Sequence, residues 1–195
     1  MINYQEKMKN RLSSILECNS TTIKMSRIGT DIFTSKTGLL GTIQYSKDIN
    51  ADIFQIFLRN PRSVKKCTKK DPDQLIKLGQ LLEENDLKMV IHSPYVLNFC
   101  KDDCQNLIDF MVTELADSAK IGDRCLGCIL HLGKSVKLDY DDAIDNFCDN
   151  IRNILGQSDD RSTLILETSS GQGTEICYNL DKFCSEIYDK FTDEE

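Results

Sequence analysis

The segment Thr163-Leu-Ile-Leu-Glu-Thr-Ser-Ser-Gly-Gln-Gly173 joins a short apolar run to a loop of small residues. Residues 164–166 have the length and composition of a buried parallel strand. The run ends on a carboxylate, Glu167, and α/β folds place functional groups at such strand ends. The segment therefore predicts an α/β fold with a candidate functional residue at Glu167.

The same pattern occurs twice upstream, in Met89-Val-Ile-His92 and in Cys128-Ile-Leu-His131. Apolar periodicity predicts strands over 27–33, 52–58, 87–92, 126–132 and 164–167. It predicts helices over 38–49, 71–85, 103–121, 141–155 and 178–191, with the polar residues 1–26 as an N-terminal arm or short helix. Strands that alternate with helices form a parallel sheet covered by helices, here in one domain over residues 27–195.

Two architectures fit this order of elements. One is about five of the eight (β/α) units of a TIM barrel, and the other is an open, doubly wound parallel sheet. A complete barrel takes about 250 residues, and this chain has 195. We therefore expect a truncated barrel or the open sheet.

Composition indicates an ordinary soluble protein, with 28% charged and 40% hydrophobic residues. No stretch is apolar enough to cross a bilayer, and the N-terminus lacks the apolar core of a signal peptide. Nine cysteines without such a signal favour free thiols in a reducing intracellular compartment, the cytoplasm or nucleus. The pair Cys125 and Cys128 begins a buried strand, which favours packing over metal binding.

The net charge of −7 argues against a protein that coats nucleic acid nonspecifically. A local basic run nevertheless occupies residues 59–70. Its members are Arg59, Arg62, Lys65, Lys66, Lys69 and Lys70. The run is either a solvated loop or a set of phosphate contacts, and composition does not choose between them.

His92 and His131 are the only two histidines of the chain, and both end an apolar strand. The carboxyl ends of parallel strands meet at one edge, so Glu167 is expected beside them. Two imidazoles and one carboxylate form a ligand set of catalytic zinc. The alternative is that the histidines are structural.

Four motifs in order resemble the endonuclease IV class of apurinic/apyrimidinic (AP) endonucleases. They are Ile28-Gly-Thr-Asp31 followed by Gly38-Leu39, Phe57-Leu-Arg-Asn-Pro-Arg62, His92-Ser-Pro-Tyr95-Val-Leu-Asn98 and Glu167-Thr-Ser-Ser-Gly-Gln-Gly173. His131-Leu-Gly lies where that family has His-Pro-Gly. The resemblance runs from about residue 28 to residue 191.

The resemblance implies a TIM barrel that carries zinc and cleaves DNA on the 5′ side of an abasic site. It makes His92, His131 and Glu167 zinc ligands, with Glu167 also catalytic because it bridges two metals. It assigns DNA contacts to the basic loop at Arg59 and Arg62, and to Tyr95 and Gln172. The expected partner is double-stranded DNA with abasic sites.

The sequence also departs from the family. Asp31 replaces a histidine, and the family's downstream ligand motifs have no counterpart. Of the family's three zinc ions, we expect one complete ligand set here. We also expect a missing C-terminal segment or self-association.

The compact, cysteine-rich form resembles versions from large DNA viruses, which would place it in host cytoplasm or virion. Two other functions stay open, a noncatalytic DNA-binding remnant and a metal-dependent sugar isomerase or epimerase.

Overall fold

The computed structural model describes residues 29–65 and 67–191. The arm or helix expected at residues 1–26 lies outside the described residues. The strands are β1 (Gly29–Asp31), β2 (Ile53–Ile56), β3 (Lys88–His92), β4 (Cys125–His131) and β5 (Leu164–Glu167). The helices are α2 (Thr34–Thr37), α3 (Gly41–Asp48), α4 (Pro72–Glu84), α5 (Gln105–Ile121), α6 (Tyr140–Leu155) and α7 (Leu180–Glu186), followed by the 3₁₀ helix η1 (Tyr188–Lys190).

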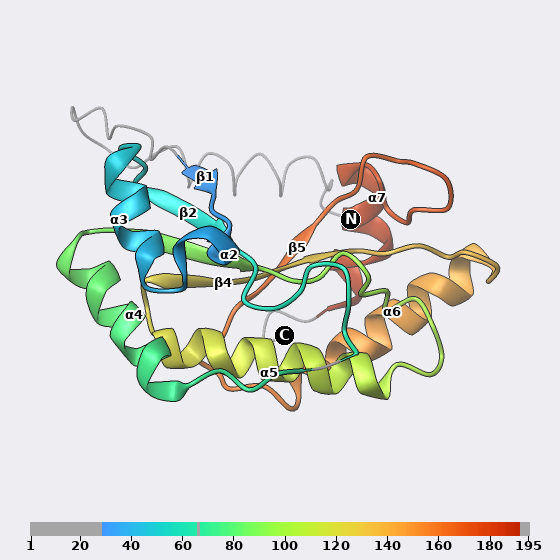
Figure 1. Cartoon of the computed structure of the whole chain (residues 1–195). Coiled ribbons are helices and arrows are strands. Elements are labelled where there is room, and N and C mark those ends of the chain that lie inside the picture. The colour runs from blue at the N-terminus through green and yellow to red at the C-terminus, as the bar shows by residue number, and fades with distance from the viewer. Residues whose placement is uncertain (1–28, 66, 192–195) are drawn as a thin grey trace, which may run out of the picture.

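The five strands form one parallel sheet in the order β1-β2-β3-β4-β5. A doubly wound sheet reverses its strand order at a switch point, so this order excludes that alternative. Right-handed crossovers between sequential strands place their helices on one face. Figure 1 shows α3, α4, α5 and α6 in an arc around one side of the strands. The expected partial (β/α) barrel is therefore confirmed.

Side-chain burial alternates along the strands, as a sheet with one covered face requires. In β2, Phe54 and Ile56 are buried beneath the helices, while Ile53 and Gln55 are half-buried. The core lies between the sheet and the helices. Its helical members include Leu75, Leu78 and Leu82 of α4, Met111 and Leu115 of α5, and Phe147 and Ile151 of α6.

Local signals place most helix ends as expected. Asp71 caps α4 by accepting a hydrogen bond from the Asp73 amide, and Pro72 opens the helix. Close packing of α4 on α5 depends on Gly79, since a Cβ there would lie 1.9 Å from the Ile121 carbonyl oxygen.

Two expected helices differ from those in the structure. The helix expected over 38–49 is preceded by the short α2, which ends at Gly38 with φ +69°. The helix expected over 178–191 is divided because Ile187, at φ −120°, separates α7 from η1. The strand expected over 27–33 is confined, among the described residues, to β1.

The described cysteines are free thiols, and all except Cys67 and Cys184 are buried. Cys128 is fully buried, and the Cys125 sulfur lies 3.2 Å from the Ser118 hydroxyl. The packing role expected for this pair is confirmed. No described helix has the length and apolar character to span a membrane.

Candidate metal centre

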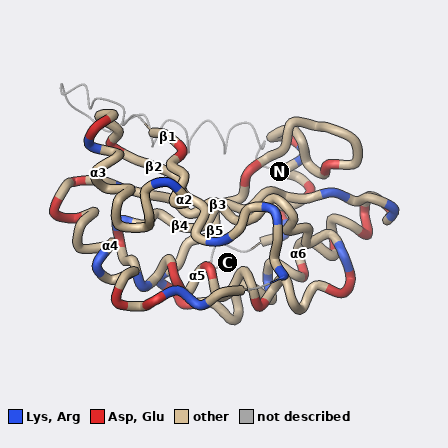
Figure 2. The backbone as a smooth tube through the Cα atoms, viewed as in Figure 1, with Lys and Arg blue, Asp and Glu red and all other residues tan. Residues whose placement is uncertain are grey.

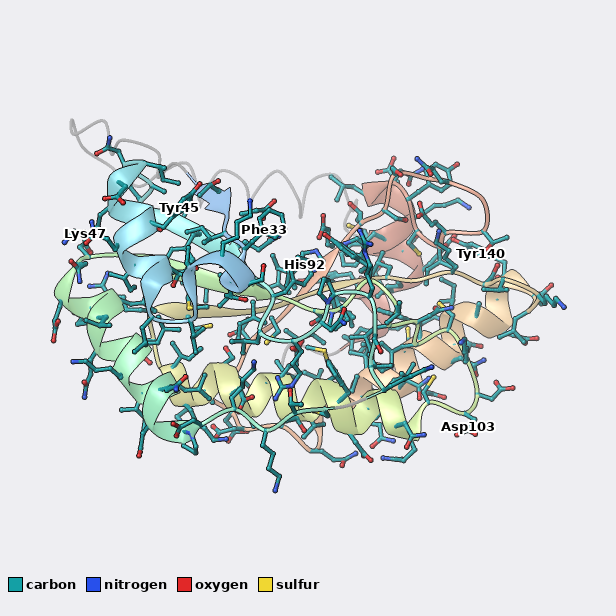
Figure 3. All side chains as sticks on the ribbon, viewed as in Figure 1. Phe33, Tyr45, Lys47, His92, Asp103 and Tyr140 are labelled. Carbon is teal, nitrogen blue, oxygen red and sulfur yellow. The ribbon has the colours of Figure 1, made fainter. Side chains whose placement is uncertain are left out.

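Three neighbouring strands bring His92, His131 and Glu167 together at their carboxyl ends. His131 and Glu167 are register partners across β4 and β5, and His92 ends β3 on the other side of β4. Figure 3 shows His92 near the centre of the molecule. Its side chain is buried, whereas those of His131 and Glu167 are 39% and 49% exposed. The group thus has a buried inner side and an accessible outer side.

The ligand atoms of the three side chains form a nearly equilateral triangle. The two Nε2 atoms lie 3.2 Å apart, and Glu167 Oε2 lies 3.4 Å from His92 Nε2 and 3.3 Å from His131 Nε2. Tetrahedral zinc with ligand bonds of about 2.0–2.2 Å has ligand-to-ligand edges of roughly 3.3–3.6 Å. The triangle therefore has the dimensions of one face of such a tetrahedron, so these three residues would fit a zinc ion.

The tautomer of His92 suits a metal ligand. Its Nδ1 lies 2.7 Å from the Ser93 carbonyl oxygen, which is an acceptor only, so Nδ1 carries the proton. The lone pair of Nε2 is then directed at His131 and Glu167. A backbone carbonyl behind a ligating imidazole is a common way to hold such a ring in place.

Aromatic rings surround the two imidazoles. The ring centroid of Phe57, which follows β2, lies 4.9 Å from that of His92 and 5.1 Å from that of Tyr95. Tyr95 also lies 5.7 Å from His131. Sequence analysis did not assign Phe57 a role at the site, although it begins one of the motifs quoted above.

The residues expected to approach DNA lie on exposed loops at the same edge. Tyr95 is 56% exposed, and its amide donates to the Pro61 carbonyl beside Arg62. Arg62 and Gln172 are exposed as well. Gln172 sits between Gly171 and Gly173, both with positive φ, and its amide donates to Glu175. Their DNA contacts stay a prediction.

Arg59 requires a correction, because it was expected to contact DNA. Its side chain is 1% exposed. Nη2 lies 2.6 Å from Asp117 Oδ2 and Nη1 lies 3.4 Å from Glu114 Oε1, and both acidic residues are buried on α5. Burial acts to lower the Arg59 pKa, but hydrogen bonding to Asp117 and the charge of Glu114 raise it overall. The guanidinium is therefore a structural ion that fixes the loop after β2 to α5.

The remainder of the basic run is divided between surface and interior. Arg62, Lys65 and Lys69 are exposed, Lys70 is half-buried, and Lys66 lies outside the described residues. Burial, and then the charge of Arg59, lower the pKa of Lys70. The exposed part of the loop therefore has fewer cations than the sequence indicates.

Within the described residues, His92, His131 and Glu167 are the one group of three or more ligand-type side chains close enough to share a metal. Asp31 stays apart from them and accepts a hydrogen bond from Gln55 at 2.8 Å. The expectation of a single complete ligand set therefore has a structural counterpart.

The chain matches the family of xylose isomerase-like TIM barrels over residues 43–194. It is 39% identical over 164 residues to a putative endonuclease 4 of Acanthamoeba polyphaga mimivirus, covering 80% of this chain and 52% of the relative. A probable endonuclease 4 of Finegoldia magna is 33% identical over 163 residues, with 81% and 56% covered. The chain spans about half the length of these curated relatives.

Solved structures agree on the fold. Endonuclease IV from Thermus thermophilus superposes with a TM-score of 0.67 at 19% identity, covering 83% of this chain and 60% of that one. A D-psicose 3-epimerase superposes with a TM-score of 0.52 at 13% identity, over 71% of this chain and 52% of that one. The chain therefore belongs to the xylose isomerase-like TIM barrel family, and its curated relatives are of the endonuclease IV class.

Proposed function

We propose that this chain is a zinc-dependent DNA repair nuclease of the endonuclease IV type. Its substrate is double-stranded DNA, and it hydrolyses the phosphodiester on the 5′ side of an abasic site. The observation that carries the proposal is the 3.2–3.4 Å triangle of His92, His131 and Glu167 at three adjacent strand ends. The endonuclease 4 relatives supply the reaction class.

Zinc bound by these three ligands would supply Lewis-acid chemistry, neutralising phosphate charge and making a water molecule more acidic. The chain's own residues would hold the zinc ion and orient the phosphate of the substrate. Two neutral imidazoles and the Glu167 carboxylate leave a net charge of +1 on a zinc complex, which suits a phosphate ligand. Glu167 is the catalytic candidate because its carboxylate lies within 3.4 Å of both imidazoles and is half exposed.

We infer that three exposed side chains on loops at this edge of the sheet contact the duplex. The resemblance assigns Arg62 and Tyr95 to the lesion and Gln172 to a loop that approaches the DNA. Tyr95 offers an aromatic face, which stacks on bases in many nucleic-acid complexes. The proposal includes a reducing, intracellular compartment, in keeping with the free thiols of the described cysteines.

Metal analysis tests the first half of this proposal. After dialysis, wild type should retain zinc in an equimolar amount. His131→Ala should lose it, because two ligands remain, whereas Glu83→Gln, a change in an exposed surface ion pair, should retain it. Equal, substoichiometric zinc in wild type and His131→Ala would show that the metal site does not exist.

A cleavage assay tests the second half and separates the alternatives. The substrate is a labelled duplex with one abasic analogue, compared with the intact duplex. Zinc-dependent incision on the 5′ side supports the nuclease, and selective binding without incision indicates the noncatalytic remnant. The epimerase alternative has its own support, since the D-psicose 3-epimerase shares the fold. Conversion of a ketose without DNA binding would favour it.

A further inference from the structure

The side chain of Asn98, in the loop after β3, makes a two-way connection to the loop after β4. Asn98 Nδ2 donates to the Lys134 carbonyl at 2.9 Å, and Asn98 Oδ1 accepts from the Lys134 amide at 3.1 Å. Oδ1 also accepts from the Cys100 amide at 3.3 Å. The amide group thus pairs with both backbone groups of Lys134, as a neighbouring strand would.

Gly133, the residue before Lys134, has the backbone conformation and the small size that this contact requires. Gly133 has φ +95°, and a Cβ added there would lie 2.4 Å from Asn98 Oδ1. Only glycine therefore lets the two loops approach so closely. Gly133 lies two residues beyond His131, the half-exposed member of the metal group.

From Lys134 the contacts continue to the loop after β5. Lys134 forms an antiparallel bridge with Glu175, and its Nζ lies 3.3 Å from Glu175 Oε1. Glu175 Oε2 accepts from the Gln172 amide at 2.8 Å. Hydrogen bonding to Gln172 and the charge of Lys134 lower the pKa of Glu175, so the carboxylate is the favoured form. A continuous path therefore runs from Asn98 to Gln172.

We propose that Asn98 is a positioning residue for the metal centre and for the DNA-facing loop, an inference that rests on the proposed function. Through Lys134 it fixes the backbone that follows His131, and through Glu175 it fixes Gln172. His131 needs such support because it ends its strand and is 39% exposed on the side chain. Small displacements of a ligand matter, since the ligand-to-metal distance tolerates only about 0.2 Å.

The chain offers a matched control in Asn150 of α6. Its Nδ2 donates to the carbonyls of Phe99 and Lys101 at 2.8 and 2.9 Å. Asn150 thus holds the same loop from the helix side through two backbone hydrogen bonds, neither of which reaches Lys134. Asn98→Ala and Asn150→Ala should therefore lose similar stability in thermal unfolding.

Zinc affinity, measured by competition with a chromophoric chelator, distinguishes the two variants. Asn98→Ala should bind zinc about tenfold more weakly, in the range typical of residues that orient ligands. Asn150→Ala should bind as wild type does. Equal zinc affinity of all three proteins overturns the positioning role and leaves the proposed function standing. A wild type without zinc affinity overturns both.

Gly133→Ala disturbs the same contact from the loop after β4. It provides a second test in case the Asn98→Ala variant does not fold. It should weaken zinc binding in wild type. In the Asn98→Ala background the contact with Oδ1 is gone, so the same change should cost less, although the φ of +95° and the Cys100 sulfur at 3.3 Å still oppose a Cβ. Glu175→Gln should weaken binding of abasic duplex, because Glu175 holds the Gln172 loop. Zinc affinity should stay unchanged, because the Asn98–Lys134 contact that supports His131 does not include Glu175. Additive effects in the Asn98/Gly133 cycle would contradict the proposal.

Discussion

Glu114 is a carboxylic acid with no solvent exposure, on the side of α5 that meets Arg59. Burial raises its pKa to about 7, although Arg59 and a hydrogen bond with Ser93 act in the opposite direction. Its Oε2 has no hydrogen-bond partner among the described residues. The folded protein therefore holds a proton on Glu114 at a pH where an unfolded chain has released it.

The consequence is a pH dependence of stability with a definite sign. Between the ordinary glutamate pKa of 4.5 and the folded value of about 7, the folded state binds more protons, so the free energy of unfolding falls as pH rises. Glu114→Gln should remove this dependence, which changes the free energy of unfolding by roughly 3 kcal/mol between about pH 4.5 and 7. Urea unfolding across that window measures it, with Glu83→Gln as the control. An unchanged slope in Glu114→Gln would place the titrating group elsewhere.

The loop between β2 and α4 combines a buried anchor with an exposed cationic stretch. Arg59 fixes its beginning to α5, while Arg62 and Lys69 reach solvent. Elsewhere Figure 2 shows acidic and basic positions together on the outer helices. A DNA contact at this loop would therefore be local rather than spread over the surface.

Two substitutions in this loop should behave differently. Arg62→Ala should weaken binding to abasic duplex more than to intact duplex, because Arg62 lies beside Tyr95 at the metal edge. Lys69→Ala should weaken both alike and flatten the dependence of log affinity on log salt by about 0.9. Fluorescence anisotropy at several salt concentrations measures both effects. Wild-type affinity of Arg62→Ala for abasic duplex would count against its role at the lesion.

At the scale of the whole molecule, the sheet has two open ends. Among the described strands, β1 and β5 each pair with one neighbour. The face of the sheet opposite α4, α5 and α6 also carries half-buried apolar residues, including Ile129 and its register partner Ile165. Unpaired strand edges beside apolar surface favour pairing with another polypeptide.

We therefore expect the isolated chain to self-associate. Its sedimentation coefficient should rise with concentration, and Ile165→Lys should return it toward the monomer because a charge on an edge strand opposes pairing. Leu180→Lys, the same kind of change at a 67% exposed position of α7, is the control. A wild-type monomer at every concentration would contradict self-association.

Much of this arrangement was predictable because it rests on local pattern. Apolar runs that end in His92, His131 and Glu167 define both the strands and the metal group. The fate of Arg59 was not predictable, since its partners Glu114 and Asp117 lie 55 and 58 residues away. In the sequence, their burial was indicated only by their positions next to the apolar stripe of α5. Strand order also depends on long-range pairing, so the sequence of elements left two folds open.

The strictly sequential strand order has a consequence for how the molecule assembles. Each strand pairs with the one that precedes it in the chain, so its first neighbour has already been synthesised when it emerges. Only one βα unit separates paired strands, which keeps the entropy of loop closure low at every step. The sheet can therefore grow on the ribosome from its N-terminal edge, one unit at a time, with each partial sheet a shorter version of the finished one.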